Sequence, residues 1–563
     1  MNLPQTLAGA VCALFLLCNV SRAHKEDTGG SRTKDDAIDG RNGEDVEVDL
    51  VIVGAGWAGL SAAHALLEHN RASGNAAPIS FHVLEAAEHV GGRALNQDVV
   101  SGAQSTISDD VVELGGEWLA PQHTAAIRMI RDVMGYPLFH RKYNVRMRSR
   151  KLKRWPRRNR DIQGKSPAEI KDAGLRIIVH TSAGTRYCDT QDEIVGTLPQ
   201  DVQRIVKDVN ASFAETAQTV SCENPLESQA KLRQWDAMSF ASWLWSATNN
   251  TEARTILAAL ADDAEELQAI SYVGALWTYN CTADLIGGDD EDFYRVRGGT
   301  QGPLLSIYDR VSDNVTLSSP VWQVVSSKDS VTVTSKRRSV KAKRVLLTGP
   351  PSALLGIQMD PPLTGDKAQL LSHMPLGTSL KYFVVYDQPW WRKLGYLGKI
   401  VTATTPPYAH RALFISECLD NSPFSWSRGV MLCFIEGSEN RRFMREYTKE
   451  QRKALVLDFL AYSFKDPQAK TGARSVIEHN WADQPWTRGA YSTYFPPGVL
   501  TEFWDEWKDI RHPAERLWVA GTDYAYAGLG YIEGAITTAL DATEQMIAEF
   551  TKERHGKEPL AVS

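Results

Sequence analysis

The sequence predicts a mixed α/β protein with two domains, one of which is a doubly wound dinucleotide-binding domain assembled from separate stretches of the chain. Three observations lead to this prediction. A strand, a glycine turn and a helix follow one another after residue 48, a second glycine turn begins at Arg295, and the chain closes on another strand, glycine turn and helix. Glycine turns of this kind bind dinucleotide phosphates. Because turns at both ends of the chain must meet on one ligand, the domain is expected to be discontinuous.

The first pattern consists of a predicted buried strand at Leu50 to Val53, a glycine turn, and a helix at Leu60 to Leu67. Its three glycines have separate tasks: Gly54 permits the tight turn, Gly56 lets the backbone approach a pyrophosphate, and Gly59 packs the helix against the strand. The first N–H groups of the helix and the positive end of its dipole then face the phosphates. The pattern therefore predicts a phosphate-binding turn.

An acidic residue ends the next predicted strand. The strand FHVLE finishes on Glu85, 26 residues after Gly59. A carboxylate in this place accepts hydrogen bonds from the hydroxyl groups of an adenosine ribose. The glycine motif alone is a weak signal, because a tight turn without a ligand is the alternative, but Glu85 favours dinucleotide binding.

Further elements follow from hydrophobic periodicity. An amphipathic helix is predicted at His123 to Met134, and the segments 211–260 and 264–277 are predicted to be mostly helical. Strands are predicted at Val321 to Val325, Val331 to Thr334, Arg344 to Thr348 and Tyr382 to Tyr386. The stretch LWVAGTDYAYAGLGYIEGAITTALDAT is the closing strand, glycine turn and helix.

Length and composition limit the class of protein. The chain has 563 residues, of which 43% are hydrophobic, and this is enough for two or more packed cores. The formal net charge of −6 argues against general binding to nucleic acid. From Arg141 to Arg160 there are eleven Lys or Arg residues. Such a run is usually a solvated loop, and an anionic partner or a processing site is the alternative.

The N-terminus is predicted to direct the chain into the secretory pathway. Leu7 to Val20 is an apolar run that is too short to span a bilayer and suits the core of a signal peptide, with cleavage after Ala23. We therefore expect a signal peptide at 1–23, a disordered leader at 24–47, and a polar tail at 553–563. No later apolar segment reaches transmembrane length, so a secreted, soluble protein without a stable membrane anchor is expected.

Sequons and cysteines add moderate support for secretion. Asn-x-Ser/Thr sequons occur at Asn210, Asn249, Asn280 and Asn314, and glycosylation at such sites is expected in a secreted protein. Five cysteines remain after cleavage, without CxxC or metal-ligand spacing. We expect no metal site and one disulfide, whose pairing the sequence leaves open, as it does the oligomeric state.

Six ordered motifs carry a resemblance to a known family. They are VIVGAGWAGLSAA, EAAEHVGGRA, ELGGEW, RVRGGTQG, MPLGTSLKYFVVYDQPWWR and WVAGTDYAYAGLGYIEGA. With these motifs the sequence resembles the flavin-containing amine oxidases, the family of monoamine and polyamine oxidases, from about Val48 to Ile547. The resemblance implies FAD as cofactor and a two-domain fold. It places an FAD-binding domain at 48–135, 297–370 and 484–552, and a substrate-binding domain of mixed sheet and helices at 136–296 and 371–483.

The resemblance also assigns residues to FAD, position by position. For the adenosine and phosphate parts, it implies that Gly54, Gly56 and Gly59 contact the pyrophosphate, that Glu85 contacts the ribose, and that the Val321 backbone contacts the adenine. Arg93 is implied to lie near the diphosphate and the isoalloxazine, and the turn at Asp523 to bind the ribityl-diphosphate part. Trp481 is implied to pack near the flavin ring, and Glu533 and Ala535 to lie beside its pyrimidine edge. Asp523 stands where the family usually has glutamate.

Three residues are implied to be catalytic. Lys381 lies on an apolar predicted strand, where an unpaired ammonium is costly; the alternative is an edge lysine that reaches solvent. In the family the matching lysine holds a water at flavin N5 and assists the reaction with oxygen. Tyr491 and Tyr531 match the aromatic cage that orients the substrate amine. Monoamine oxidases have a flavin-linked cysteine before the first cage tyrosine, whereas this chain has Ala490, so non-covalent FAD is expected.

The predicted function is that of a secreted FAD-dependent amine oxidase acting on a small amine and O₂. The resemblance implies hydride transfer from the amine α-carbon to flavin N5, hydrolysis of the imine to an aldehyde and ammonia or a smaller amine, and reoxidation by O₂ with release of H₂O₂. A polyamine oxidase is one alternative, because Glu117 or the acidic run from Asp284 to Asp292 could bind distal ammonium groups. An enzyme of secondary metabolism that oxidises a complex amine is another.

Two further alternatives are disfavoured. An L-amino acid oxidase would have an arginine after the glycine pair to bind the substrate carboxylate, and the chain reads GGEWLAPQH there. A non-catalytic flavin-binding homologue would have no reason to keep Lys381, Tyr491 and Tyr531.

Overall fold

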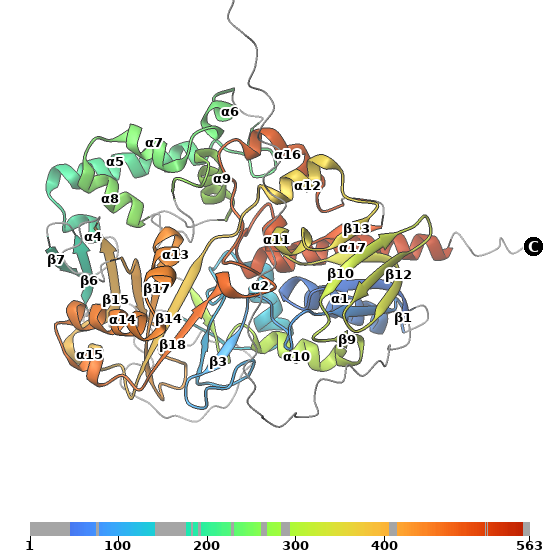
Figure 1. Ribbon diagram of the computed structural model, residues 1–563, viewed down its shortest axis with the longest axis horizontal. Coiled ribbons are helices and arrows are strands. Elements are labelled where there is room, and N and C mark those ends of the chain that lie inside the picture. Colours follow the sequence, from blue (N-terminus) through green and yellow to red (C-terminus); the bar gives the residue numbers. More distant parts are fainter. Residues whose placement is uncertain are drawn as a thin grey trace, which may run out of the picture. The chain divides into compact units, whose positions relative to one another are not determined.

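The computed structural model describes two large β-sheets and the helices that pack on them (Figure 1). The described residues are 46–74, 78–140, 176–181, 184–189, 193–226, 230–260, 267–282, 293–404, 414–512, 514 and 516–555. The predicted signal peptide, the basic stretch Arg141 to Arg160, the acidic run Asp284 to Asp292, and most of the predicted leader and tail lie outside them. The predicted mixed α/β class with a doubly wound dinucleotide-binding part is confirmed.

The first sheet is assembled from three distant parts of the chain. Its strands, in spatial order, are β13 (Gln358–Asp360), β10 (Val321–Ser326), β11 (Val331–Ser335), β12 (Ser339–Leu347), β1 (Val46–Val53), β2 (Phe81–Leu84) and β9 (Val315–Thr316), and β19 (Leu517–Val519) also pairs with β12. Strand β1, drawn in blue near β12 in Figure 1, runs parallel to both β12 and β2. Both faces of these parallel strands are buried, which explains their continuous runs of Val, Ile and Leu.

Alternate residues of β1 belong to two different cores, as the two-residue period of a strand requires. Leu50 and Ile52 pack in one core with helices α1 (Trp57–Ala72) and α17 (Ile532–His555), which also contact each other. Val51 packs in the other core with residues of β10, β11 and β12. The N-terminal glycine turn and the last helix of the chain therefore lie at one place, as the sequence analysis expected.

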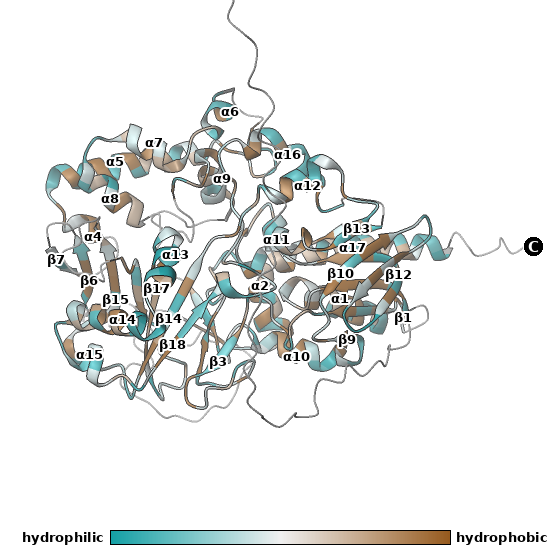
Figure 2. Ribbon diagram, in the orientation of Figure 1, coloured by the Kyte–Doolittle hydropathy of each residue, from teal (hydrophilic) through white to brown (hydrophobic). Residues whose placement is uncertain are grey.

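The second sheet has seven strands. In spatial order they are β18 (Ser475–Asn480), β14 (Ser379–Tyr386), β17 (Gly429–Glu436), β16 (Glu417–Asp420), β15 (Tyr396–Ala403), β6 (Arg176–Thr181) and β7 (Gly184–Cys188). Neighbouring strands are antiparallel, except for β15 and β6. Much of β15 and β17 is hydrophobic, whereas helix α13 (Gly437–Glu446) is largely hydrophilic (Figure 2).

Strand β14 is buried along its whole length and separates two cores. Tyr382 and Val384 pack with helix α14 (Lys449–Phe464) on one face. Phe383 and Val385 pack on the other face, against a core that contains β4 (Val111–Glu113) and Trp481. Because side chains alternate along a strand, Lys381 lies on the same face as Phe383 and Val385 and points toward the segment that follows β4.

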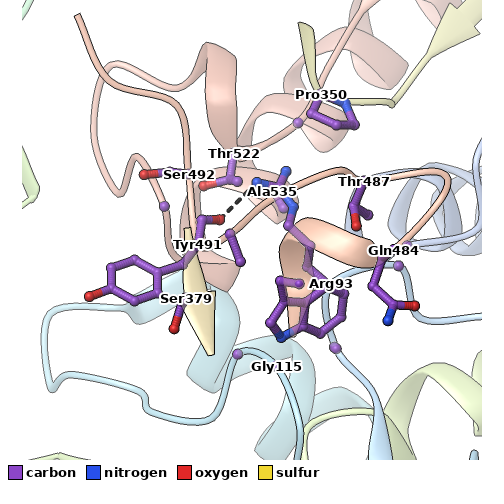
Figure 3. Close-up of a pocket in the computed structure, with 18 of the residues that line it drawn as sticks. Arg93, Gly115, Pro350, Ser379, Gln484, Thr487, Tyr491, Ser492, Thr522 and Ala535 are labelled. Carbon is purple, nitrogen blue, oxygen red and sulfur yellow. Dashed lines mark hydrogen bonds between the residues drawn. The ribbon is translucent and has the colours of Figure 1, made fainter. Parts of the chain in front are cut away.

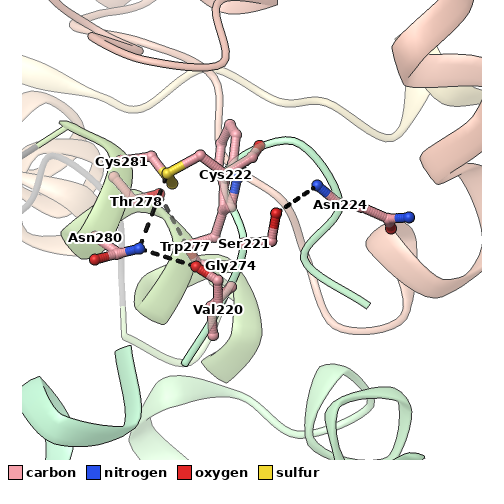
Figure 4. Close-up of a disulfide and its surroundings, with 9 residues drawn as sticks. All are labelled: Val220, Ser221, Cys222, Asn224, Gly274, Trp277, Thr278, Asn280 and Cys281. Carbon is pink, nitrogen blue, oxygen red and sulfur yellow. Dashed lines mark hydrogen bonds between the residues drawn. A yellow bond between two sulfur atoms is a disulfide. The ribbon is translucent and has the colours of Figure 1, made fainter. Parts of the chain in front are cut away.

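Helices α5 (Gln200–Ala217), α7 (Phe240–Ala247), α8 (Thr251–Leu260) and α9 (Tyr272–Thr282) form a helical part in which α5 packs on α8 and α9. A disulfide between Cys222 and Cys281 anchors the end of α9 (Figure 4). Beside it, Trp277 donates a hydrogen bond of 2.9 Å from Nε1 to the Cys222 carbonyl.

Within the described residues there are two disulfides, where the sequence analysis expected one. The second joins Cys418 and Cys433, which lie directly opposite each other on β16 and β17. This register depends on strand pairing, so the spacing of the cysteines could not reveal it.

Several predicted boundaries shift. Strand β1 begins at Val46, because the backbone at 46–47 pairs with β12, so the last two residues of the predicted leader are ordered. Helix α17 extends to His555, and Glu553 and Arg554 of the predicted tail form ion pairs with Arg344 and Asp49. The predicted helix at 123–134 is a short α2 (Thr124–Ile127) followed by a π-helical turn at Arg128–Val133.

The strands of the first sheet fall within the segments predicted to bind FAD, apart from the start of β1, and those of the second sheet fall within the segments predicted to bind substrate. The described residues from Val46 onward nevertheless form one compact unit. The division into two domains at the predicted boundaries stays a prediction.

Candidate active site

A cavity of about 550 Å³ is lined by residues of both sheets and brings most of the predicted site together. The predicted residues in its lining are Gly54, Gly56, Glu85, Arg93, Val321, Lys381, Trp481, Tyr491, Tyr531 and Ala535. Gly59, Asp523 and Glu533 are not part of the lining. The cavity thus joins the glycine turn to the predicted catalytic groups, although these lie more than 300 positions apart in the chain.

The glycine turn has the shape of a phosphate cradle. Gly54 has φ +107°, and a Cβ there would lie 2.4 Å from Thr348 Oγ1. At Gly59 a Cβ would lie 1.9 Å from the Gly54 carbonyl oxygen. At Gly56, in contrast, the nearest atom would be 3.7 Å away, and this residue precedes α1 without a side-chain cap. Among the described residues, no atom lies close enough to require glycine at position 56. Because no side chain caps α1, its first backbone N–H groups can bind an anion.

Glu85 lies at the adjoining edge of the cavity. Its carboxylate accepts hydrogen bonds from the backbone N–H groups of Ala55 at 2.6 Å and Ala87 at 2.8 Å. Burial raises the pKa of Glu85. Because each carboxylate oxygen has two acceptor positions, two ribose hydroxyls can still be bound. The cradle and Glu85 together fit the diphosphate and ribose of a dinucleotide.

Arg93 and Asp523 connect the segment after Gly91 and Gly92 to the loop of Tyr491, the first of the two predicted cage tyrosines. Arg93 Nη1 donates a hydrogen bond of 2.8 Å to the Tyr491 carbonyl, and its guanidinium is ion-paired with Asp523. Figure 3 shows Arg93 reaching this carbonyl while the tyrosine ring points the other way. The buried Asp523 also accepts a hydrogen bond from the Thr493 N–H at 3.0 Å. In the turn of Asp523, Gly521 and Thr522 line the cavity.

Glu533 has a partner within the protein. Its carboxylate accepts hydrogen bonds from the backbone N–H groups of Ala125 at 3.0 Å and Ala126 at 2.7 Å. It therefore caps the N-terminus of α2. Ile532 and Ala535, at the start of α17, are the residues that line the cavity. The implied contact of Glu533 with the pyrimidine edge stays a prediction.

Lys381 is an interior lysine, because β14 lies between β18 and β17. Its side chain is only 6% exposed, so the alternative of an edge lysine that reaches solvent is wrong. Nζ donates hydrogen bonds to the carbonyl oxygens of Gly115 at 2.7 Å and Glu113 at 3.4 Å. Burial lowers the pKa of Lys381. Because its position is fixed, the Lys381 ammonium can bind a water molecule in the cavity or donate a proton to a group bound there.

A buried cluster of charges lies beside Lys381, and only Glu117 of this cluster was singled out from the sequence. Arg295 forms ion pairs with Glu113 at 2.5 Å and with Glu117 at 2.8 Å. Glu117 also accepts a hydrogen bond from Asn421. Burial, opposed by the charge of Arg295, raises the pKa of Glu113 to about 7. Arg295 and Asn421 both bind Oε1 of Glu117, and the alternative in which Glu117 binds a distal ammonium group stays a prediction.

The two predicted cage tyrosines line the same cavity. The Tyr491 hydroxyl donates to Glu436 Oε1 at 3.3 Å, and the Ser379 hydroxyl donates to the same oxygen at 3.3 Å. The ring of Tyr531 packs on His123, with 4.7 Å between ring centroids. Burial lowers the pKa of His123 to about 4. The function of the two rings as a cage stays a prediction.

Other residues define the surroundings of these groups. Trp481 donates a hydrogen bond of 2.8 Å from Nε1 to the Leu114 carbonyl and lines the cavity, as does Ala490. On β15 and β16, Lys399 and Glu417 form an ion pair of 2.9 Å in the cavity wall. Helices of the described parts of the chain are too short or too polar to span a membrane. In the same parts, no group of three or more His, Cys, Asp or Glu residues could hold a metal ion.

Comparisons with known proteins agree with this geometry. The profile of the family described as flavin containing amine oxidoreductase matches residues 57–547. Amine oxidase [flavin-containing] B of Sus scrofa is 27% identical over 89% of this chain and 86% of the relative. An L-amino acid dehydrogenase of Synechocystis is 24% identical over 89% of this chain and 94% of the relative. The structure of wild-type putrescine oxidase bound to putrescine has a TM-score of 0.74 and 25% identity, over 89% of this chain and 99% of that chain.

Proposed function

The chain belongs to the family of flavin-containing amine oxidoreductases and is an FAD-dependent amine oxidase, and from this premise we propose that it is secreted, holds FAD without a covalent bond, and oxidises neutral amines at the α-carbon. One observation carries the proposed amine oxidation: Lys381, Tyr491 and Tyr531 line the same cavity as the phosphate cradle. The carbonyl product and ammonia or a smaller amine would follow from hydrolysis of the imine, and H₂O₂ from O₂.

We expect FAD to be bound by groups of the cavity wall that can still form hydrogen bonds to a ligand. The open N-terminus of α1 at Gly56 would hold the diphosphate, Glu85 the ribose, and the Val321 backbone the adenine. Arg93 and the N-terminal turn of α17 would lie toward the flavin. The bound flavin supplies the acceptor for the hydride of the substrate, which is the difficult part of the chemistry.

The protein residues would position the amine and exclude water. Tyr491 and Tyr531 would bind the neutral nitrogen between electron-rich rings. Trp481 and Lys381 would close the neighbouring wall, with the Lys381 ammonium near the site where negative charge develops on oxygen. Ala490 has no sulfur, and this supports an FAD that is bound by contacts alone.

One observation favours diamines or polyamines over simple monoamines. Glu436 lines the cavity and accepts hydrogen bonds from the hydroxyls of Tyr491 and Ser379. A carboxylate at this place can bind the ammonium of a second amino group. The similarity to putrescine oxidase points the same way. Lys399 in the cavity wall is paired with Glu417, so its ammonium does not support binding of a substrate α-carboxylate.

The test is a peroxide-release screen with the purified FAD-loaded protein. The panel comprises arylalkylamines, aliphatic monoamines, diamines of matched chain length, spermidine and L-amino acids. Diamines should exceed monoamines in kcat/KM, and Glu436→Gln should lower kcat/KM for diamines while sparing monoamines of the same length. Peroxide release from L-amino acids alone would contradict the proposal, and equal loss on both amine classes would remove Glu436 from substrate selection.

Secretion is proposed from the predicted signal peptide and from one well-placed sequon. Asn249 is exposed in the loop between α7 and α8, whereas Asn280 and Asn314 donate their side-chain amides to the carbonyls of Val220 and Phe81. In a secretory host we expect a mature N-terminus at His24 and a glycan at Asn249 that Asn249→Gln removes. A secreted protein with an intact Met1 or an unmodified Asn249 would contradict these expectations.

A further inference from the structure

We propose that Glu117, supported by Glu113 and Arg295, is a positioning residue that acts through Lys381 by exchanging a proton with its ammonium group during the reaction with oxygen. The inference rests on the proposed role of Lys381. The reaction needs a proton at this place, and the buried cluster is arranged to return one.

Glu117 lies close to the ammonium group of Lys381. A lysine ammonium has three donors, and two of those of Lys381 are taken by the carbonyls of Gly115 and Glu113. Glu117 Oε2 lies 3.8 Å from Nζ and, although buried, has no hydrogen-bond partner. A buried acceptor without a partner is costly. A separation of 3.8 Å can be closed by a small shift or by one bridging water.

The side chains of Glu113, Glu117, Arg295 and Lys381 are all at least 94% buried. With all four ionised the cluster is neutral. Arginine does not release its proton in proteins, so a proton lost from Lys381 leaves one uncompensated negative charge. A buried charge of this kind is unfavourable, and uptake of one proton from solvent, passed through Glu117 to Lys381, removes it.

The groups that face Lys381 from other strands do not replace Glu117. On β17, Glu436 is engaged by Tyr491 and Ser379. On β18, burial and the charge of Lys381 lower the pKa of His479 to about 4, so this imidazole is neutral at physiological pH. Asp420 on β16 acts on Arg295 rather than on Lys381. Among the described residues of this cluster, Glu113 Oε1 and Glu117 Oε2 are both buried without a hydrogen-bond partner, and Glu117 Oε2 is the oxygen that lies 3.8 Å from Nζ.

The proton balance defines the step. Reduction of O₂ to H₂O₂ consumes two electrons and two protons. The hydride taken from the amine supplies both electrons and one proton. The second proton leaves the Lys381 ammonium, whose N–H bond breaks as the O–H bond of the peroxide forms. The Glu117 carboxylate then takes up a proton from solvent that enters the cavity after product release and passes it to the Lys381 amine, so that both groups are ionised again.

The experiment is a double-mutant cycle in the FAD-loaded full chain. Lys381→Met, Glu117→Gln and the double variant are reduced with substrate and mixed with O₂, and reoxidation is followed by flavin absorbance. Glu117→Gln keeps the size of the side chain and should slow reoxidation by about 10- to 100-fold. In the Lys381→Met background it should add nothing, because it acts through Lys381. Glu549→Gln, which removes a carboxylate paired with Arg344 on the surface, is the matched control.

A second readout does not depend on turnover. Reduction places negative charge beside the cluster and draws a proton onto it, so the flavin potential depends on pH. In Glu117→Gln this dependence should be shallower near neutral pH, and in Glu549→Gln it should be unchanged; Glu113→Gln is a second cluster variant in case Glu117→Gln folds poorly. Independent, multiplying effects of the two substitutions, or an unaltered pH dependence, would overturn the inference. Normal reoxidation in Lys381→Met would instead overturn the proposed role of Lys381.

Discussion

Lys381 Nζ donates a hydrogen bond of 2.7 Å to the carbonyl oxygen of Gly115, 266 positions earlier in the chain. At Gly115 a Cβ would lie 1.9 Å from the Arg93 carbonyl oxygen and 2.8 Å from the Trp481 ring. The backbone at Gly115 therefore approaches Arg93, Trp481 and Lys381 at once, and only a residue without a side chain permits this. The hydrogen bond joins the second sheet to the segment that carries the predicted cofactor site.

Lys381→Met should slow the reaction of the reduced enzyme with O₂, or the reduction step, by about 10²-fold or more, because it removes a positive group next to developing negative charge. FAD should remain bound, since no contact of Lys381 supports the phosphate cradle. Stopped-flow absorbance at several oxygen concentrations measures both steps. Lys343→Met, at a lysine paired with Asp49 away from the cavity, is the control. Unchanged turnover and oxygen dependence would remove Lys381 from the mechanism.

Asp523→Ala should destabilise the protein by about 3–5 kcal/mol and weaken FAD binding. The substitution leaves Arg93 without its ion-pair partner and the Thr493 N–H without its acceptor, and removal of one member of a buried pair is strongly destabilising. Urea unfolding and FAD titration measure the two effects. The exposed pair of Asp541 with Arg511 supplies the control, because Asp541→Ala should cost at most about 1 kcal/mol. Equal costs at the two sites would contradict the structural role of Asp523.

The free energy of unfolding should fall as pH rises from about 4.5 to about 7, in part because of Glu113. Its pKa in the folded protein, about 7, lies above its usual value of 4.5, so the folded state binds the proton more tightly than the unfolded state. The stabilisation is complete below the unfolded value and lost above the folded one, a change on the order of a few kcal/mol.

Glu113→Gln should flatten this pH profile, measured by urea unfolding at fixed FAD concentration. Burial also raises the pKa of Glu85, which contributes with the same sign, so a reduced slope should remain in the variant. An identical slope in the parent and in Glu113→Gln would show that Glu113 titrates near its usual value.

The flavin should be released intact by acid or heat denaturation, because Ala490 at the cavity wall offers no sulfur for a thioether. The measurement is flavin fluorescence in the supernatant after precipitation. Ala490→Cys offers the missing sulfur and tests whether the geometry allows the bond. Fluorescence that stays with the precipitated parent protein would point to another attachment residue.

Much of the fold could be predicted because its signals are local. The turn at Gly54, the third glycine at Gly59 and the acidic end of β2 at Glu85 each follow from a short-range requirement of the backbone or from a strand period. The strand of Lys381 was recognised by its apolar neighbours, although its direction toward Gly115 comes from tertiary packing. The motifs of the family then identified Tyr491 and Tyr531, which share the cavity with Lys381.

The ion cluster could not be predicted, because its members meet only in the folded protein. Glu113 and Arg295 are 182 positions apart. The sequence did indicate that Glu113 and Glu117 need partners, because acidic residues in the apolar stretch VVELGGEWL must be paired if they are buried. The identity of the partner depends on the pairing of β5 (Leu138–His140) with β8 (Tyr294–Val296), which places Arg295 there. For the same reason the sequence offered Glu117 only as a possible ligand of a distal ammonium group and gave no sign of its contacts with Arg295 and Asn421.

The last prediction concerns the protonation of the substrate at the two tyrosines. A hydride leaves readily only from a carbon whose nitrogen lone pair is available, so the reactive amine is neutral. An alkylammonium has a pKa of about 10.4, as lysine does, and only a small fraction is neutral at pH 7. Desolvation in the cavity favours the neutral form. The rate at limiting substrate should therefore rise with pH until a group of the enzyme titrates.

Tyr491→Leu and Tyr531→Leu should each lower this limiting rate by about 10-fold or more, and more than they weaken FAD binding, because the rings orient the nitrogen. The measurement is kcat/KM against pH for one amine, with FAD affinity determined in parallel. Tyr308→Leu, on helix α10 (Gly302–Val311) away from the cavity lining, is the control. An additional loss in the double variant would show that one ring alone retains part of the effect. Full activity of both single variants on every amine that the parent oxidises would show that these tyrosines are packing residues. Tyr491 would then serve its hydrogen bond to Glu436, and Tyr531 its contact with His123.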